Sequence, residues 1–474
     1  MSNSKTKPFG IRDKLGYMFG DFGNDFTFLL SSSFLMKFYT DVMGVDGYIV
    51  GIIMIPTIVG IIMMVARFVD AFTDVAMGRI CDRSKMTPVG KFKPWIRRMC
   101  GPVVIVSFLM YQSGLSGLPQ WAKIVYLTIT YILWGSVFYT SINIPYGSMA
   151  SAISDDPGDR QSLSTFRTMG GMFAGAFIMA GVPLMIYDKV NGNDILNGKR
   201  FTIIAGVCSI LAFICYILCY SLTTERVRTE ASADAMRQNS VGNMLKNALK
   251  NRALISIIVA SVFMLVSQLT IQQMANYVFP NYYGNAKAQS LSMVVMGGGM
   301  LVAALIAKPL AKKIGKAEMS VIANMLAGVV CIILYFVRPQ NVWVYVSFQF
   351  LSWFGLGVFS MVTWALITDV IDYSEIKNGI REDGSVYALY SFARKLGQAA
   401  SAGLTGALLS LIGYDQSTAF MPEVKEGIFD ISTLVPAASF IILALILWFW
   451  YPLHKKQVEE NVAILREKHS SGKE

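Results

Sequence analysis

The sequence predicts an all-α membrane protein that crosses the bilayer many times. Hydrophobic residues make up 54% of the 474 residues and charged residues only 15%, whereas soluble domains carry about 25% charged residues. A hydrocarbon core about 30 Å thick requires roughly 20 apolar residues per helix, and apolar runs of that length recur along the chain. The length accommodates about a dozen spans with short loops and leaves no room for a separate enzyme domain.

Twelve apolar runs mark the expected spans, and a polar interval divides them into two sets of six. The spans are expected at 17–43, 47–78, 99–117, 122–149, 165–187, 201–222, 253–282, 289–311, 318–337, 342–371, 385–412 and 430–452. The longest polar interval, TTERVRTEASADAMRQNSVGNMLKNALKNR, follows the sixth run. We therefore expect a six-helix bundle at 1–222, a linker at 223–252, a second six-helix bundle at 253–452 and a tail at 453–474.

The basic residues indicate the orientation of the spans. The net charge of +11 comes from Lys and Arg residues in loops beside the spans, as the positive-inside rule expects, and a nucleic-acid partner is not needed to explain it. The loop after the second span carries the densest basic cluster: Arg79, Arg83, Lys85, Lys91, Lys93, Arg97 and Arg98. We therefore expect this loop and both termini to face the cytoplasm, with the protein in the cytoplasmic membrane.

Neither the first residues nor the cysteines indicate processing or a bound cofactor. The N-terminal segment MSNSKTKPFGIRDKLGYMFG lacks the short apolar core and the cleavage site of a signal peptide. The six cysteines show no CxxC spacing and no neighbouring histidine, which argues against a disulfide framework or a metal site. We expect no cofactor.

Three charges on one face of the second span point to an ion site. In RFVDAFTDVAMGRICDR, Arg67, Asp70 and Asp74 fall within an arc of about 60° on a helix. Isolated charges in hydrocarbon cost at least a few kcal/mol each, so this face should look into the bundle or a watery cavity. Two carboxylates one turn apart, with the hydroxyl of Thr73, suit Na⁺. A shared proton and a structural salt bridge are the alternatives.

Spans one, four and five carry polar side chains that fit a sugar or ion site. Asp21 and Asp25 lie four residues apart in GDFGND, and Asp25 is the better candidate because Asp21 lies nearer the cytoplasmic end. Arg167 either snorkels to the interface or offers its donors to hydroxyls or a carboxylate. Span four adds Tyr139, Thr140 and Asn143, just before a proline that loosens the helix.

The second half contains charged and aromatic candidates in spans ten and eleven. Arg394 and Lys395 are adjacent, so they point about 100° apart and only one faces a central cavity squarely; Lys395 is our choice. This positive charge favours a carboxylate-bearing sugar. Trp364 and Tyr390 could stack on a sugar ring, although such residues also simply pack.

Seven charged residues are expected to have gating or structural roles, and those at the cytoplasmic end of span ten should form gating salt bridges with the basic loops. These residues are Arg67, Asp82, Arg83, Asp369, Asp372, Glu375 and Arg394.

Seven short segments together resemble one family of transporters. They are GDFGND (20–25), YTDVMGV (39–45), ARFVDAFTD (66–74), GKFKPW (90–95), NIPYGS (143–148), TDVIDYSEIK (368–377) and RKLGQA (394–399). In this order they resemble the glycoside-pentoside-hexuronide:cation symporters, a branch of the major facilitator superfamily that includes the melibiose and glucuronide carriers. The resemblance implies the twelve-helix major facilitator fold and import of a glycoside with Na⁺ or H⁺ by alternating access.

The resemblance also implies roles for individual residues. Asp70 and Asp74 look like the cation-site carboxylates, with Thr73 and Thr140 as possible further ligands. Asp25 and Arg167 match positions that bind sugar hydroxyls, and Lys395 matches a lysine that lies near the cation and sugar sites. The other candidate substrate residues are Tyr139, Asn143, Trp364 and Tyr390.

Departures from the melibiose-type pattern direct the substrate prediction. Asn143 stands where those carriers have an aspartate and Gly147 where they have a tryptophan, so the chain looks closer to the glucuronide and pentoside carriers. Thr73 replaces an asparagine associated with Na⁺ binding, which leaves Na⁺ and H⁺ both open.

The expected partners are a glycoside, a coupling cation and the lipid bilayer. The glycoside is a glucuronide, a xyloside or another glycoside, and we expect a monomer without a fused regulatory domain. The alternatives are a lipid or lysolipid cation symporter of the same fold and a membrane enzyme acting on lipid-linked sugars.

Overall fold

The computed structural model describes residues 8–45, 49–50, 53–54, 58–154, 156–227, 251–378 and 383–471. These residues are mostly helical, as the sequence predicts. They form two compact units. Unit 1 comprises Met1–Ala233, Gly284–Ser290 and Gly406–Met421, and unit 2 comprises Asp234–Tyr283, Leu291–Thr405 and Pro422–Glu474.

Unit 1 contains the helices that carry most of the candidate site residues. Its elements are α1 (Ile11–Asp41), β1 (Ile49–Val50), β2 (Ile53–Met54), α2 (Ile58–Arg83), α3 (Lys93–Leu109), η1 (Ser113–Leu115), α4 (Gln120–Ile132), η2 (Leu133–Tyr139), α5 (Thr140–Ile153), α6 (Pro157–Ala176), η3 (Phe177–Gly181), α7 (Pro183–Ile186), β3 (Tyr187–Val190), β4 (Asn193–Leu196) and α8 (Gly198–Leu222).

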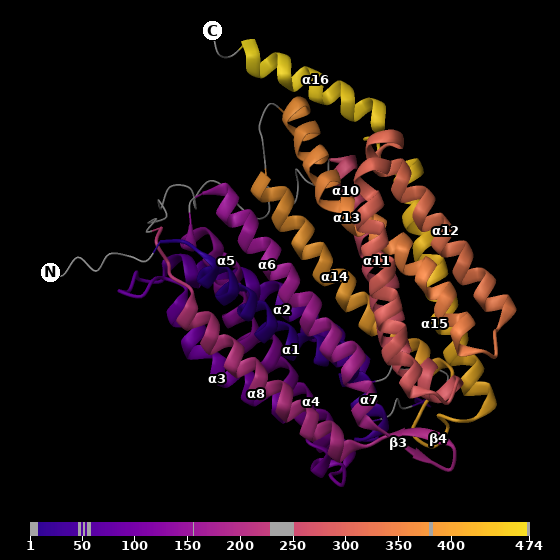
Figure 1. The fold of residues 1–474 in the computed structure, drawn as a ribbon. Coiled ribbons are helices and arrows are strands. Elements are labelled where there is room, and N and C mark those ends of the chain that lie inside the picture. Colours follow the sequence, from indigo (N-terminus) through magenta and orange to yellow (C-terminus); the bar gives the residue numbers. More distant parts are fainter. Residues whose placement is uncertain are drawn as a thin grey trace. The chain divides into compact units, whose positions relative to one another are not determined.

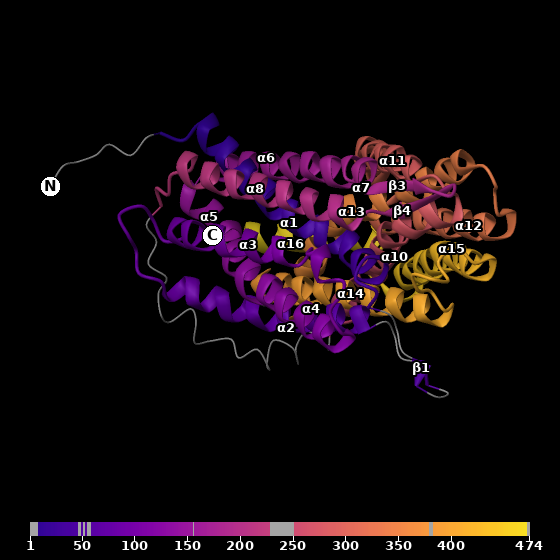
Figure 2. The ribbon, with the colours of Figure 1, turned by 90° about the horizontal axis from the view of Figure 1, so that it is seen from below.

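Helix α1 packs closely against its neighbours because glycines line one of its faces. It lies beside α6 and α8 (Figure 2). A Cβ atom added at Gly20 would come within 2.2 Å of the Tyr146 ring of α5, and one at Gly23 within 2.8 Å of the Tyr216 ring of α8. Small residues let membrane helices approach this closely, so both tyrosines reach the polar face of α1.

Units 1 and 2 share helices at their boundaries. The remaining elements are α10 (Arg252–Tyr277), η4 (Val278–Tyr282), α11 (Ala286–Ile314), α12 (Lys316–Val337), α13 (Val342–Asn378), α14 (Asp383–Leu411), α15 (Pro422–Leu445), η5 (Ile446–Trp450) and α16 (Lys455–Ser471). The start of α11 and the end of α14 belong to unit 1, and the other residues of these elements to unit 2. The buried apolar core of unit 2 comes mainly from α10, α12, α13 and α15, and α16 lies against α12 and α13 (Figure 1).

Eight helical segments in the described residues are long and apolar enough to cross a membrane. They are Gln120–Ile153, Gly158–Ile186, Gly198–Leu222, Arg252–Tyr282, Ala286–Ala307, Lys316–Val337, Val342–Ile376 and Pro422–Trp450. The other expected spans correspond to α1, α2 and α14, which carry the charged candidates, and to α3, which has 17 residues. A count of twelve is consistent with this set.

Several elements were not predicted from the sequence. The expected second span, 47–78, is wrong at its start, because β1 and β2 pair there and α2 begins at Ile58; the expected tail contains helix α16, and a hairpin follows the expected fifth span. The expected fifth span ended at 187, but β3 and β4 form an antiparallel hairpin there, with Tyr187 paired to Leu196 and Val190 to Asn193. The turn residues Asn191 and Gly192 both have positive φ angles, of 50° and 84°. Asn-Gly turns of this kind match the twist of two paired strands.

Candidate functional site

Two carboxylates on α2 face two hydroxyls, one in η2 and one at the start of α5. The Ser136 hydroxyl donates to Asp70 Oδ1 at 2.5 Å, and the Thr140 hydroxyl donates to Asp74 Oδ1 at 2.8 Å. We call Asp70, Asp74, Ser136 and Thr140 the candidate cation site. Asp70, Asp74 and Thr140 could be predicted for this site from the sequence, whereas Ser136 was not predicted.

The local backbone explains why Asp70 can approach so closely. Residues Leu133–Tyr139 form a wide π-helical turn, a feature that is frequent at functional sites. A Cβ atom on Gly135 would lie 3.3 Å from Asp70 Oδ1, so the carboxylate packs against the bare α-carbon. The Gly135 carbonyl accepts from the Thr140 amide and lies 3.2 Å from the Thr140 hydroxyl.

Arg67 places a positive charge beside Asp70. Its Nη1 lies 3.2 Å from Asp70 Oδ2, and both side chains are buried. The guanidinium also lies 5.0 Å from the Phe28 ring centre and 5.9 Å from that of Tyr131.

Thr73 lies on the same helix but its hydroxyl has a different partner. It donates to the main-chain carbonyl of Asp70 at 3.2 Å, a bond within its own helix. In the part of the chain that the structure describes, this hydroxyl makes no hydrogen bond to either carboxylate. Its role as a cation ligand remains a prediction.

A second polar cluster joins α1 to α6. Arg167 Nε lies 2.9 Å from Asp21 Oδ1, and the arginine side chain is 42% exposed. Its guanidinium also lies 5.3 Å from the Tyr146 ring centre. Asp25 is the better candidate from the sequence, but in the structure Arg167 forms its ion pair with Asp21. Because Arg167 is both paired and accessible, it does not simply snorkel away from the helix bundle.

Asp25 lies beside this ion pair without joining it. A Cβ atom on Gly171 of α6 would lie 2.9 Å from Asp25 Oδ2 and 3.1 Å from Asp21 Oδ2, so both carboxylates occupy the space that this glycine leaves open. Asp25 makes no ion pair within the described residues. We call Asp21, Asp25, Arg167 and Asn143 the candidate sugar site.

Asn143 is held in place by a short chain of hydrogen bonds. The Tyr216 hydroxyl donates to Asn24 Oδ1 at 3.0 Å, and Asn24 Nδ2 donates to Asn143 Oδ1 at 3.2 Å. In this arrangement the amide group of Asn143 keeps its own N–H donors for another partner. Asn24 and Tyr216 were not predicted, because each supports Asn143 instead of reaching the site itself.

The two candidate sites are connected through one helix and one aromatic contact. Thr140 and Asn143 lie three residues apart on α5, so they occupy neighbouring positions on one face. Tyr139 stacks on Phe28 with ring centres 5.6 Å apart, and the same Phe28 ring contacts Arg67. Tyr139, a predicted substrate residue, is therefore engaged in aromatic packing.

The predicted substrate residues of the second half lie on α13 and α14 in unit 2. Tyr390 is buried, Lys395 is half-buried and the neighbouring Arg394 is exposed, which agrees with the expectation that the two basic residues point apart. The side chains of Trp364 and of the gating candidate Asp82 lie outside the described residues.

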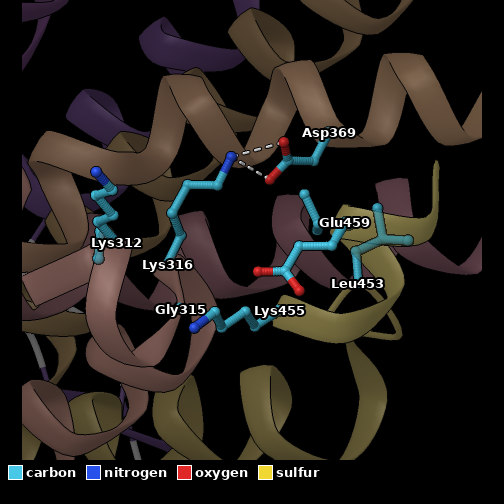
Figure 3. Close-up of a pocket in the computed structure, with 9 residues that line it drawn as sticks. Lys312, Gly315, Lys316, Asp369, Leu453, Lys455 and Glu459 are labelled. Atoms are coloured by element: carbon cyan, nitrogen blue, oxygen red, sulfur yellow. Dashed lines mark hydrogen bonds and ion pairs between the residues drawn. The ribbon is translucent and has the colours of Figure 1, made fainter. Parts of the chain in front are cut away.

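Asp369, another gating candidate, lines a pocket of about 210 Å³ in unit 2. The Lys316 ammonium contacts both oxygens of its carboxylate, at 2.6 and 2.5 Å, and Glu459 of α16 lies on another side of the pocket (Figure 3). Asp369 thus has the basic partner expected of a gating residue, although gating itself stays a prediction. Of the other gating candidates, Arg83 is exposed, Asp372 is half-buried and Glu375 is buried.

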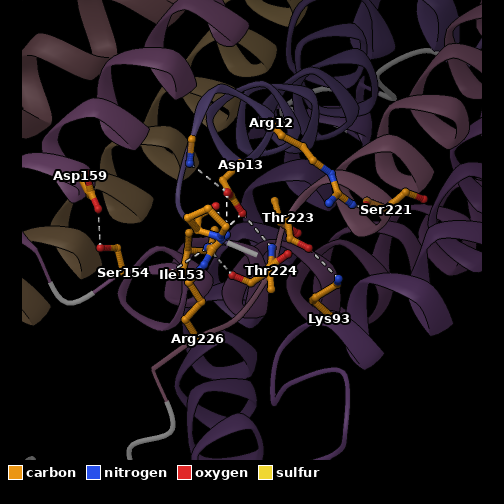
Figure 4. Close-up of polar contacts among 12 residues, drawn as sticks. Arg12, Asp13, Lys93, Ile153, Ser154, Asp159, Ser221, Thr223, Thr224 and Arg226 are labelled. Atoms are coloured by element: carbon orange, nitrogen blue, oxygen red, sulfur yellow. Dashed lines mark hydrogen bonds and ion pairs between the residues drawn. The ribbon is translucent and has the colours of Figure 1, made fainter. Parts of the chain in front are cut away.

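The start of the predicted linker is fixed to unit 1 by ionic contacts. Arg226 Nη2 lies 2.8 Å from Asp13 Oδ2, and the Thr224 amide donates to Asp13 Oδ1 at 3.0 Å (Figure 4). Glu225 accepts from the amides of Lys91, Phe92 and Lys93 at 2.6–3.0 Å. Burial raises the pKa of the Glu225 carboxyl, and these amide hydrogen bonds offset part of that effect. Residues 228–250 of the predicted linker lie outside the described residues.

Comparisons with known proteins identify chains of the same length and fold. Residues 16–455 match the model of a family described as MFS/sugar transport protein. A glucuronide carrier protein homolog of Escherichia coli (strain K12) is 28% identical over 95% of this chain and 94% of its own. A putative sulfoquinovose importer of the same organism is 29% identical over 96% and 93%. The crystal structure of a D-xylose-proton symporter has a TM-score of 0.63, at 13% identity, covering 93% of this chain and 97% of its own.

Proposed function

Because this chain belongs to the MFS/sugar transport family, we propose that it imports a glycoside together with a monovalent cation that binds at the candidate cation site. The chain is a multi-pass membrane transporter of the major facilitator fold and not an enzyme. The observation that carries the proposal is the pairing of two buried or half-buried carboxylates with two hydroxyls on a facing helix.

The cation site is suited to Na⁺ by its chemistry. Hard cations prefer oxygen ligands. Asp70 and Asp74 supply carboxylate oxygens, and Thr140 supplies a hydroxyl oxygen that bonds Asp74. The cation removes the repulsion between the two carboxylates. A proton taken up by the same carboxylates is the second candidate.

Coupling between cation and sugar runs through α5. The cation binds the Thr140 hydroxyl and shifts the first turn of α5. This shift moves Asn143, which lies three residues further along the same helix. Coupling free energies are reciprocal, so the sugar must tighten cation binding by the same factor as the cation tightens sugar binding. With both bound, the two halves exchange between inward-facing and outward-facing states.

The candidate sugar site favours a substrate that carries both hydroxyls and an acidic group. Asp25 accepts hydrogen bonds from sugar hydroxyls. Arg167 and the N–H groups of Asn143 are donors that suit a carboxylate or sulfonate. Lys395 of unit 2 is a further basic candidate for binding an acidic substrate. The names of two relatives include a glucuronide and sulfoquinovose, which supports an acidic sugar such as a glucuronide. A neutral xyloside or other glycoside is the second candidate.

The proposed placement follows the charge distribution of the loops. Both termini face the cytoplasm, the membrane is the cytoplasmic membrane, and bundles at 1–222 and 253–452 flank the linker at 223–252. The protein acts as a monomer. A lipid or lysolipid carrier of this fold would need an apolar cavity, and the polar side chains of Asp25, Asn143 and Arg167 argue against one.

The Asp70→Asn variant tests the cation assignment. It keeps the size of the side chain but removes a charge that Arg67 and Ser136 contact, so gradient-driven accumulation of the glycoside should be abolished. Uptake is measured in cells with the amount of protein in the membrane quantified. Undiminished accumulation by a well-expressed variant would refute the assignment.

Competition between a glucuronide and its neutral glucoside tests the substrate class. Inhibition of uptake should be stronger for the glucuronide, because only this compound carries a carboxylate for the donors of the site. Equal inhibition by both would remove the reason to propose an acidic sugar.

A further inference from the structure

We infer that Ser136 is a specificity-determining residue of the cation site, where its hydroxyl oxygen binds the coupling Na⁺ and its hydrogen bond orients Asp70. This inference rests on the proposed function, because it adds a ligand to the same site. None of the sequence patterns that pointed to the site included this residue.

The two hydroxyls of the cation site have the same spacing as the two carboxylates that they face. Asp70 and Asp74 lie four residues apart on α2, and Ser136 and Thr140 lie four residues apart across η2 and the start of α5. Each hydroxyl bonds the carboxylate opposite, at 2.5 and 2.8 Å. Ser136 therefore has the same relation to Asp70 that Thr140, a predicted cation ligand, has to Asp74.

A serine hydroxyl can bond a carboxylate and a cation at the same time. It has one hydrogen to donate and two lone pairs to offer. The hydrogen of Ser136 points to Asp70, so the lone pairs of its oxygen remain available to a cation lying between the two helices. Ser136 is only 4% exposed, and hydroxyl oxygens in such surroundings are good ligands for a hard cation.

Gly135, the residue before Ser136, has no side chain, and this leaves room for the Asp70 carboxylate. The Asp70 carboxylate packs 3.3 Å from the Cβ position of Gly135, and Arg67 contacts its other oxygen at 3.2 Å. The carboxylate is thus held on two sides and its Oδ1 is directed at Ser136. A ligand fixed in this way favours one ionic radius over another, so Ser136 should influence the preference between Na⁺ and Li⁺.

A purely structural role for Ser136 makes different predictions. If the hydrogen bond only held α2 against η2, its loss would lower the amount of folded protein and its thermal stability. It would leave the half-saturating Na⁺ concentration of the folded molecules and their Na⁺/Li⁺ preference unchanged. The two roles therefore separate in an ion titration.

The test titrates Na⁺ and Li⁺ against glycoside uptake in vesicles for the full chain and four variants. Ser136→Ala removes the ligand, and Ser136→Cys replaces oxygen with a soft sulfur at nearly the same volume. Ser136→Thr retains the hydroxyl. Ser141→Ala is the matched control, because Ser141 lies on α5 and makes no hydrogen bond within the described residues.

We expect Ser136→Ala and Ser136→Cys to raise the half-saturating Na⁺ concentration by about tenfold or more and to change the Na⁺/Li⁺ ratio. Ser136→Thr should stay within about threefold of the natural protein, and Ser141→Ala should match it. The cysteine variant keeps the test decisive if the alanine variant does not reach the membrane.

Different outcomes refute the inference and the proposed function. An unchanged Na⁺ dependence in both Ser136→Ala and Ser136→Cys, or uptake by the natural protein that only a proton gradient drives, overturns the role of Ser136 alone. If no imposed cation gradient drives uptake by the natural protein, the proposed function itself is wrong.

Discussion

Replacing Gly171 with alanine should weaken sugar binding specifically. The added Cβ would lie 2.9 Å from Asp25 Oδ2, whereas ordinary contacts begin near 3.4 Å. The carboxylate must therefore retreat by the difference, 0.5 Å, or α6 must move away from α1. The same atom comes within 3.1 Å of Asp21 Oδ2, so the partner of Arg167 is displaced as well.

The size of the effect follows from the cost of overfilling a packed site. Extra methyl groups in packed interiors typically cost about 1–3 kcal/mol. If this free energy destabilises the sugar-bound state, the half-saturating sugar concentration rises between about 5-fold and about 140-fold. The half-saturating cation concentration at saturating sugar should change much less, because Gly171 does not touch the candidate cation site.

The assay is initial-rate glycoside uptake over a range of sugar concentrations, with a matched control on the same helix. Gly175→Ala adds a methyl group one turn further along α6, where the nearest atom, on Leu29, lies at an ordinary distance of 3.8 Å. This control should behave like the natural protein. A Gly171→Ala variant with an unchanged sugar dependence, or a Gly175→Ala variant with an equal defect, would contradict the placement of Asp21 and Asp25.

Three further substitutions test separate contacts. Thr140→Ala removes a hydrogen bond to a charged group, which is worth about 1.5–3 kcal/mol. The half-saturating cation concentration should therefore rise by more than about tenfold. The control is Thr128→Ala, which removes a hydroxyl that bonds its own helix and should leave the same titration unchanged. Tyr216→Phe removes the hydroxyl that bonds Asn24 and so loosens Asn143. Sugar affinity in competition binding should fall by about 2–10-fold, with cation affinity retained. Unchanged sugar affinity would mean that this support is unimportant. Arg226→Gln leaves the buried Asp13 without its charge partner, so thermal unfolding of purified protein should occur at lower temperature, and an unchanged midpoint would contradict a stabilising role.

The fold class and the charged face of α2 could be predicted from the sequence. Apolar runs of membrane-spanning length have a local pattern, and Arg67, Asp70 and Asp74 are close enough in sequence for helical spacing to place them together. Charges in hydrocarbon are expensive, which made these three residues conspicuous. The family match confirms the class of transporter that the sequence segments indicated.

Contacts between distant segments could not be predicted in the same way. Ser136 is a small polar residue in an apolar run, where a bond to its own helix is the usual expectation, and its i,i+4 spacing to Thr140 was a signal only once both were known to face α2. Asn24 and Tyr216 meet across 192 positions. Asp21 was set aside because it lies nearer the cytoplasmic end of its helix, and that position gives no information about its ion pair with Arg167 on α6. The β3–β4 hairpin did have a local signal in Asn191 and Gly192.

Gradient-driven uptake is the measurement that tests the central claim most directly. Right-side-out vesicles containing the natural protein are given a labelled glucuronide and an imposed inward Na⁺ or H⁺ gradient, and the accumulated compound is then identified. Accumulation of unchanged glucuronide above its external concentration, driven by Na⁺ and lost in an Asp74→Asn variant, is the result we predict. Uptake that merely equilibrates under every gradient, or that Asp74→Asn leaves intact, would contradict cation-coupled import at Asp70 and Asp74.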